Sequence, residues 1–339
     1  MFLFAFATLC PVVLLLLAVL WGGVMPLVAL GYMTVLVFGL DRLIAVEAKN
    51  SARDAEFPAA DALLYMLGLS HLVLLVAAVW AVAGPGGLSA LNRVLIAVTA
   101  GMIFGQVSHP VAHELIHRPG RGARLLGRLI YSTLLFGHHA SAHLLVHHIH
   151  VGSDADPNSP RLGRGFYRFA LRAGIGSFRA ALRAETARYG RGQPRAAWRH
   201  PFVFYTGVAV LSAAGAGAAL GWAGFGAFLA IVIYAQMQIL LSDYVQHYGL
   251  RRKVLDNGRL EPVGPQHSWN APHWYSSALM VNAPRHSDHH TTPARPYPAL
   301  QLQPGTMPML PLPVPMMAAI ALVPPLWRKI MDRRVAEWA

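Results

Sequence analysis

Residues 1–40 read MFLFAFATLCPVVLLLLAVLWGGVMPLVALGYMTVLVFGL and contain no Asp, Glu, Lys or Arg. A helix needs about 20 apolar residues to cross the hydrocarbon core of a bilayer, so this stretch is long enough for two crossings with a turn at Trp21-Gly22-Gly23. No basic residue precedes the first apolar run, which is also longer than the core of a cleaved signal peptide. The stretch therefore predicts a membrane-spanning helical hairpin.

Further uncharged runs cover residues 62–92, 94–112 and 201–242. The last of these is long enough for two crossings, and we expect a break near Gly221–Gly224. The predicted fold is an all-α integral membrane protein with six transmembrane helices in three hairpins. The spans are predicted near residues 2–20, 24–40, 62–82, 92–109, 202–220 and 225–243. We treat residues 1–339 as a single membrane-embedded domain.

The charge distribution predicts the orientation in the membrane. Only 13% of the residues are charged, about half the share in soluble proteins, yet the net charge is +13. All of the 28 Lys and Arg residues except Arg93 lie in three segments, 41–61, 113–200 and 247–339. Basic connecting segments face the cytoplasm. We therefore expect a multi-pass protein of the inner membrane with both termini and these segments on the cytoplasmic side, where they also attract anionic lipids rather than nucleic acid.

Two apolar segments outside the predicted spans are too short or too rich in proline to cross. Residues 125–140 predict a re-entrant or interfacial helix that closes the site. Residues 300–327 contain seven prolines, which interrupt a spanning helix. We expect an extended stretch there, followed by a short interfacial helix near residues 315–331.

Three histidine clusters stand out in the predicted cytoplasmic segments and at span ends. They are His113-Glu114-Leu115-Ile116-His117, His143-Leu144-Leu145-Val146-His147-His148 and His286-Ser287-Asp288-His289-His290. Histidines three or four residues apart share one face of an α-helix, so each cluster can present several imidazoles to one point. Three such clusters predict a site for more than one metal ion. Imidazole suits Fe, Zn, Cu and Ni, so the ligand type alone does not select the metal.

Two other metal proteins would use some of these residues. The first cluster also reads HExxH, the pattern of zinc proteases, in which the Glu is a general base. That site needs one further ligand and leaves most histidines of the other clusters unexplained. A metal transporter would place its ligands near the middle of the bilayer rather than at the cytoplasmic ends of the spans. The single cysteine, Cys10, excludes a thiolate cluster within this chain.

The order and composition of the clusters resemble the integral-membrane alkane hydroxylases (alkane 1-monooxygenases) and their aryl-methyl relatives. The wider superfamily contains the membrane fatty-acid desaturases and hydroxylases. Residues 243–250, DYVQHYGL, are similar to the NYxEHYG element of the hydroxylase branch. The last cluster extends the resemblance, with Asn282 before it and Pro293, Arg295, Tyr297 and Leu300 after it.

The resemblance implies six transmembrane helices with a cytoplasmic cap that holds a di-iron site. Its nine ligands correspond to His113, His117, His143, His147, His148, His247, His286, His289 and His290. A ligating imidazole needs an acceptor for its second nitrogen. We expect such acceptors among Glu114, Asp154, Asp156, Asp243, Gln246, Asn282 and Asp288. The chain departs from the family pattern at Ala142 and Gln246, where Glu is usual, and at Ser242-Asp243, where Asn is usual.

The reaction that the resemblance implies is hydroxylation of an unactivated C–H bond, such as the terminal methyl of an alkane, with two Fe ions, O2 and two electrons. An acyl-lipid desaturase or hydroxylase with the same site is the alternative, and a metal transporter or sensor is the alternative from another class. The chain has no dinucleotide-binding fingerprint, so electrons must come from a partner. The family uses a rubredoxin or ferredoxin with its NAD(P)H reductase. Arg251-Arg252-Lys253 or the arginines of residues 161–199 are candidates for docking an acidic carrier.

Overall fold

The computed structural model describes residues 1–44, 46–47, 49–52, 55–190 and 196–338. Within these residues the chain is helical, and isolated bridges such as that between Glu47 and His273 take the place of strands. The predicted all-α class is therefore confirmed. The residues of the chain that these ranges leave out belong to the predicted cytoplasmic segments 41–61, 113–200 and 247–339. They include Arg53, Arg191 and Arg195.

Five helices of the described chain are long and apolar enough to cross a membrane. The first two, Phe2–Trp21 (α1) and Met25–Leu43, form the hairpin expected from residues 1–40, and Gly22 and Gly23 turn the chain with φ of 60° and 58°. The others are Pro58–Ala83 (α4), Ala90–His117 and Pro201–His247 (α11). Two of the five contain a π-helical turn. Met25–Leu43 consists of α2 (Met25–Gly31), the π-turn η1 (Tyr32–Leu36) and α3 (Val37–Leu43). Ala90–His117 consists of α5 (Ala90–Ile103), the π-turn η2 (Phe104–Ser108) and α6 (His109–His117).

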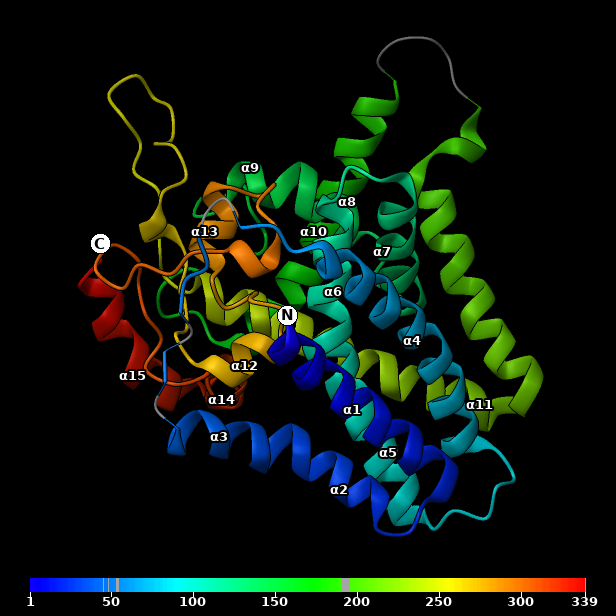
Figure 1. The fold of residues 1–339 in the computed structure, drawn as a ribbon. Helices are drawn as coiled ribbons and strands as arrows, with labels where there is room; N and C mark the ends of the chain where they lie inside the picture. The colour runs from blue at the N-terminus through cyan, green and yellow to red at the C-terminus, as the bar shows by residue number, and fades with distance from the viewer. Residues whose placement is uncertain (45, 48, 53–54, 191–195, 339) are drawn as a thin grey trace.

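The fifth helix is long enough for two crossings. At about 1.5 Å per residue, the 47 residues of α11 measure roughly 70 Å, more than twice the hydrocarbon thickness of a bilayer. Gly221 interrupts it with φ 63° and ψ −156°, a backbone conformation that favours glycine. Figure 1 shows the chain changing direction sharply in the middle of α11. The break lies where the sequence predicted a turn between two spans.

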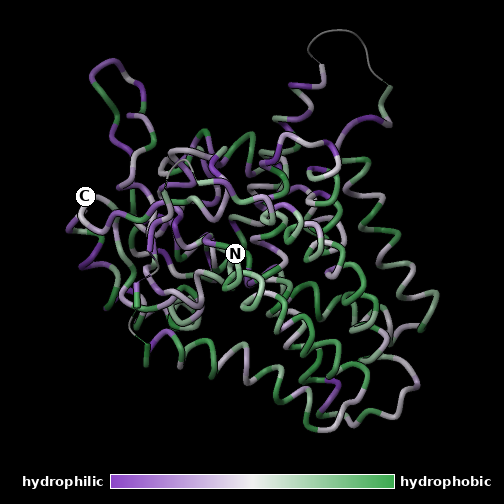
Figure 2. Tube along the Cα trace, in the orientation of Figure 1, coloured by the Kyte–Doolittle hydropathy of each residue, from purple (hydrophilic) through white to green (hydrophobic). Residues whose placement is uncertain are grey.

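The remaining helices, most of them short, cover one end of these long helices. Figure 2 shows hydrophobic residues dominating the long helices at the lower right, whereas hydrophilic residues gather at the upper left among the short helices and loops. The helices of this set that precede α11 are α7 (Arg121–Thr133), α8 (His139–Ala142), η3 (His143–His147), α9 (His148–His150), the longer α10 (Phe166–Tyr189) and η4 (Ala197–Arg199). Those after it are η5 (Pro265–His267), α12 (Trp274–Leu279), α13 (His286–Thr291), η6 (Tyr297–Ala299), α14 (Val314–Ala321) and α15 (Pro324–Ala336).

The proline-rich segment differs in detail from the prediction. An extended stretch leads into a helix as expected, but the predicted single helix near 315–331 is two, α14 and α15. Pro324 and Pro325 separate them, because a proline cannot donate the backbone hydrogen bond that would continue α14. Pro324 instead starts α15, where a missing N–H costs nothing.

Candidate metal centre

Nine buried or half-buried histidines gather where the long helices meet the short ones. They are the nine residues that the resemblance nominated, and they come from α6, η3, α9, the end of α11, and α13. Their ring nitrogens form two groups, and within each group the nitrogens lie within 4.8 Å of one another. Five histidines form the first group: His113, His117, His143, His148 and His289. Four form the second: His147, His247, His286 and His290.

The first group is a chain of close nitrogen contacts. Nε2 of His289 lies 2.8 Å from Nε2 of His113 and 3.2 Å from that of His148. Nε2 of His143 lies 2.9 Å from that of His148 and 3.0 Å from that of His117. Three of these nitrogens therefore face two others each.

The second group repeats this arrangement beside the first. Nε2 of His286 lies 3.0 Å from Nε2 of His247 and 3.1 Å from that of His290. The ring of His290 is also 4.7 Å, between centroids, from the ring of His148 in the first group. The two groups are thus neighbours in one buried region.

The π-helical turn η3 explains how the second cluster serves both groups. On an α-helix His143 and His147, four residues apart, would share a face, as their spacing predicts. A π-helix closes i→i+5 hydrogen bonds, so its turn is wider and residues five apart come close to the same face. His143 and His148 consequently meet in the first group, and His147 turns to the second.

The donor set fits a cation better than a hydrogen-bond network. A protonated Nε2 has no lone pair, so each nitrogen either donates or accepts a hydrogen bond. One N–H group makes a well-aligned hydrogen bond to one neighbour. His143, His148 and His289, each facing two neighbours, cannot all be satisfied in this way. Imidazole nitrogens bind a transition-metal ion at about 2.1 Å, so two ligands at a right angle around one ion lie about 3 Å apart. The observed separations match that spacing.

Burial keeps most of these rings neutral, which metal ligation requires. Loss of hydration lowers the pKa of His143, His148, His289 and His290 well below the usual range, and the neighbouring histidines lower it further. For His286 burial lowers the pKa to about 3. Among the described residues, His247 Nδ1 and His290 Nδ1 have no hydrogen-bond partner.

His147 has a carboxylate partner. Burial alone would lower its pKa, but the attraction and hydrogen bond of Asp156 outweigh burial, and the pKa of His147 is raised. The Nδ1–Oδ2 distance is 2.8 Å, and Asp156 also accepts hydrogen bonds from Ser159 Oγ (2.6 Å) and the Asn158 backbone N–H (3.0 Å). Because a carboxylate accepts, Nδ1 of His147 donates and Nε2 faces the second group.

Asp243 joins this network through Asn158. Its Oδ2 accepts a hydrogen bond of 2.6 Å from Nδ2 of Asn158, which connects it to Asp156. Asn158 was not among the predicted residues. The signal for it is the alternation Asp154, Asp156, Asn158 directly after the second cluster, a turn-forming pattern whose side chains bond to nearby backbone groups.

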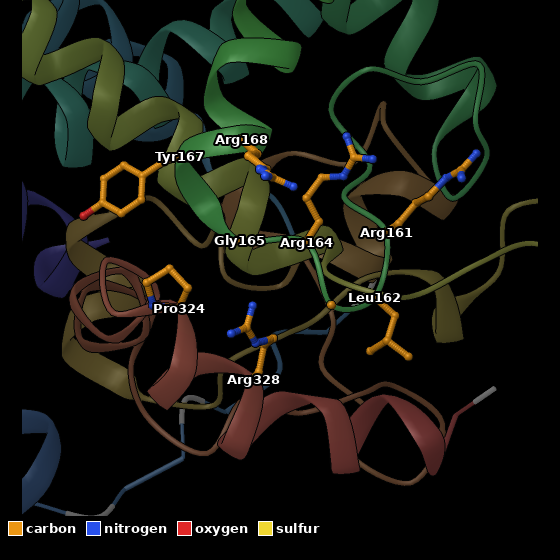
Figure 3. Close-up of a pocket in the computed structure, with 9 residues that line it drawn as sticks. Arg161, Leu162, Arg164, Gly165, Tyr167, Arg168, Pro324 and Arg328 are labelled. Carbon is orange, nitrogen blue, oxygen red and sulfur yellow. The ribbon is translucent and has the colours of Figure 1, made fainter.

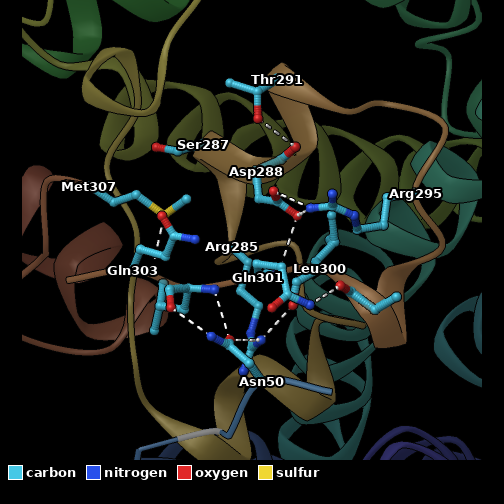
Figure 4. Close-up of polar contacts among 12 residues, drawn as sticks. Asn50, Arg285, Ser287, Asp288, Thr291, Arg295, Leu300, Gln301, Gln303 and Met307 are labelled. Carbon is cyan, nitrogen blue, oxygen red and sulfur yellow. Dashed lines mark hydrogen bonds and ion pairs between the residues drawn. The ribbon is translucent and has the colours of Figure 1, made fainter. Parts of the chain in front are cut away.

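Asp288 holds the segment that follows the last cluster (Figure 4). It is paired with Arg295 and accepts a hydrogen bond of 2.8 Å from the Gln301 backbone N–H. Arg285, three residues earlier, donates to Asn50 Oδ1 at 2.8 Å. The residue predicted as a histidine partner therefore fastens residues 295–301 to α13.

The remaining predicted acceptors bond elsewhere within the described chain. Asn282 donates to the Tyr297 carbonyl (2.9 Å), and Gln246 accepts from Ser242 Oγ (2.9 Å) and donates to the Ala283 carbonyl (3.0 Å). Glu114 lies 3.6 Å from Arg118, and Asp154 is on the surface, bound to Arg161 and Arg251. Of the seven candidates, Asp156 is thus the one with a hydrogen bond to a histidine of either group among the described residues.

Further buried histidines border the two groups. Nδ1 of His109 is 3.0 Å from the hydroxyl of Tyr131, and its ring centroid is 5.6 Å from that of His139. The His139 ring is in turn 5.7 Å from His143. Away from this cluster, His71 Nε2 contacts Thr133 Oγ1 at 3.1 Å.

Comparison with known proteins assigns the family. The model of the Fatty acid desaturase family matches residues 88–311, which include all nine histidines. The chain is 32% identical to Alkane 1-monooxygenase 2 of Pseudomonas aeruginosa over 89% of this chain and 83% of that protein. It is 30% identical to Alkane 1-monooxygenase 2 of Alcanivorax borkumensis over 91% and 83%. The Xylene/toluene monooxygenase hydroxylase component of Pseudomonas putida is 28% identical over 70% and 63%.

These matches agree with the motifs and with the two histidine groups. The family match spans the helices Ala90–His117 and Pro201–His247 as well as the segments that carry the histidines. The chain belongs to the alkane 1-monooxygenase family of integral-membrane hydroxylases, within the fatty acid desaturase superfamily.

Proposed function

We propose that this protein is a di-iron monooxygenase that hydroxylates an unactivated C–H bond, such as the terminal methyl of an alkane, in a lipophilic substrate. The observation that carries the proposal is the pair of adjacent histidine groups, with five and four convergent imidazoles. The substrate class follows the names of the relatives, which are alkane and xylene/toluene monooxygenases. The site would take two Fe ions, with O2 as co-substrate.

The nine histidines named above would hold the two ions, one in each group. When bound, iron supplies the redox chemistry with O2 that protein side chains lack. The chain contributes neutral imidazole ligands, a carboxylate that fixes the orientation of His147, and a buried setting that excludes water. Asp156 and Asp243 also bring negative charge to a region otherwise rich in neutral donors.

An apolar cavity supports a lipophilic substrate. It has a volume of about 420 Å³ and lies between α4 and α11, with Leu72, Trp80, Leu211 and Phe228 among its walls. Thr133 of α7 closes one side of it, and α7 packs against α6, which carries His113 and His117. We propose that the hydrocarbon enters this cavity from the bilayer.

We also propose the membrane arrangement predicted from sequence: six spans in three hairpins, one catalytic domain, and the termini and histidine groups on the cytoplasmic side of the inner membrane. The break at Gly221 supports division of α11 into two spans. The basic composition of residues 113–200 and 247–339 supports the orientation. A rubredoxin or ferredoxin with its NAD(P)H reductase would supply electrons from the cytoplasm, and the basic surface at Arg251, Arg252 and Lys253 supports docking of an acidic carrier.

The first prediction concerns iron content. Purified protein should contain about two iron ions per chain by elemental analysis, one for each histidine group. His289→Ala in the first group and His290→Ala in the second should each lower the iron content, because each removes a ligand. The matched control is His150→Ala, which lies in the same region but in neither group. Equal iron in all four proteins would contradict the assignment.

The second prediction concerns the carboxylate that orients His147. Asp156→Asn should lower iron affinity or turnover by about 10- to 100-fold, because partners of metal-bound histidines have effects of that size. Asp154→Asn is the control, since Asp154 is exposed and bonds to arginines on the surface. Iron titration and steady-state turnover with a supplied donor would measure both variants. A loss of the same size in both would show that Asp156 has no special role.

The third prediction concerns the reaction itself. Membranes that contain the protein, given a rubredoxin, its reductase, NAD(P)H and O2, should convert members of a panel of alkanes, alkylaromatics and fatty acids to alcohols. Gas chromatography with mass spectrometry distinguishes an alcohol from an alkene. An alkene product would favour the desaturase alternative, and no oxidation of any compound would refute the monooxygenase proposal.

The fourth prediction tests the six spans. In a Cys10→Ala background, cysteines placed at Gly86 and Trp222 should react with a membrane-impermeant maleimide in intact spheroplasts. A cysteine at Asn257 should react only after the membrane is opened, because the 247–339 segment faces the cytoplasm in the proposal. Trp222 is 88% exposed and directly follows the break in α11. Protection of position 222 would contradict the division of α11 into two spans.

A further inference from the structure

A pocket outside the histidine region lies between the start of α10 and the start of α15. Its volume is about 710 Å³. Four arginines line it, Arg161, Arg164, Arg168 and Arg328, together with residues that include Tyr167 and Pro324. In Figure 3, Arg168 from α10 and Arg328 from α15 extend toward the same space between the two helices.

The pocket is strongly positive. None of its lining residues is acidic, and only Arg161 has an ion pair, with Asp154 at the surface. Arg164, Arg168 and Arg328 form no ion pair with any described residue. Asp332, one turn after Arg328, instead accepts a hydrogen bond of 2.7 Å from Tyr248. Guanidinium groups bind phosphate through paired hydrogen bonds, so unpaired arginines that share one pocket suit a phosphate-bearing ligand.

Exposed apolar side chains lie near the pocket-lining residues on α10 and around Pro324. Leu171 on α10 is 69% exposed, and Val323 and Leu326, on either side of Pro324 and Pro325, are 51% and 43% exposed. The Tyr167 hydroxyl donates to the Leu322 carbonyl (2.9 Å), which fixes the rim of the pocket to the end of α14.

That helix places the pocket at the level of the membrane surface. α14 is uncharged, and its residues Met316 and Ala319 face a cavity shared with Met33, Val37 and Phe38 of the second predicted span. The rim of the pocket is therefore attached to a helix that packs on a span near its predicted cytoplasmic end.

We propose that this pocket binds the headgroup of an anionic glycerophospholipid of the cytoplasmic leaflet. The phosphate would lie among Arg164, Arg168 and Arg328, and the acyl chains would cover Leu171, Val323 and Leu326. Basic pockets on the cytoplasmic side of membrane proteins bind anionic lipids in this manner. The inference uses the membrane placement proposed above but not the reaction.

The exposed apolar rim favours a lipid over an acidic protein. A soluble carrier would meet the arginines but would have to cover Leu171, Val323 and Leu326 as well, whereas a lipid supplies charge and hydrocarbon together. Bound lipid would also stabilise residues 161–165 beside the histidines. The Gly163 N–H donates to the Tyr248 hydroxyl (2.8 Å) and the Tyr244 hydroxyl donates to the Arg164 carbonyl (2.7 Å), and Tyr248 directly follows His247.

Native mass spectrometry of the full-length protein tests the proposal. The protein, purified in a zwitterionic detergent, is mixed with equimolar dioleoyl-phosphatidylglycerol and dioleoyl-phosphatidylcholine, and separately with sn-glycerol 3-phosphate. The pocket variant is Arg164→Gln/Arg168→Gln/Arg328→Gln. The matched control, Arg188→Gln/Arg199→Gln/Arg259→Gln, removes the same charge from exposed positions that do not line the pocket. If the triple variant does not fold, Arg168→Gln and Arg328→Gln are measured singly, since both side chains are exposed.

We expect wild type and control to retain phosphatidylglycerol in preference to phosphatidylcholine, and the pocket variant to bind it at least about tenfold more weakly. Equal loss in the control would overturn the proposal, because it would indicate diffuse attraction. Binding of glycerol phosphate as strong as that of the lipid would also overturn it, in favour of a soluble phosphate ligand. The same holds if the pocket variant loses affinity for an acidic rubredoxin while its phosphatidylglycerol binding is unchanged. None of these outcomes depends on turnover or iron content.

Discussion

Imidazole nitrogens approach one another to about 3 Å in this protein, and that crowding constrains the rest of the structure. Such contacts are unfavourable for neutral rings unless a proton or a cation lies between them, and burial removes the water that would otherwise relieve them. The rings must therefore be held by the backbone. Four separate stretches of the sequence supply them, in α6, in the adjoining η3 and α9, at the end of α11 and in α13, so the helices must pack at fixed depth and rotation for both groups to form.

Close packing of the long helices provides that rigidity. At Gly105, in the π-turn η2 just before α6, a Cβ atom would lie 2.2 Å from Cβ of Gln238 on α11. Glycine thus lets α11, which ends at His247, approach the helix that carries His113 and His117. Gln106 and Gln238 are hydrogen bonded across the same contact (3.1 Å), which satisfies polar groups in an apolar region.

Much of this architecture could be predicted from the sequence. Uncharged runs located the long helices because a bilayer demands length and hydrophobicity, and the glycines at 22, 23 and 221 marked turns. The nine histidines were identified by motif, and the structure brings all nine together. Local spacing could not assign them to groups, because the π-turn η3 changes which residues share a face. The hydrogen-bond and ion-pair partners of the acidic residues could not be predicted either. Asp288 pairs with Arg295 and Asp156 with His147, and the turns that bring these pairs together are not specified by the sequence.

The two groups are built partly from consecutive residues. His147 and His148 belong to different groups, and so do His289 and His290. One peptide unit thus separates ligands of one site from ligands of the other, at two places in the chain. Ordering the histidines of one group therefore also orders the neighbouring histidines of the other. The first cation to bind would meet most of the entropic cost of arranging both sites, so the second would find its ligands already in place. A centre that takes one cation in each group would then fill as a unit, with a half-loaded state only sparsely populated.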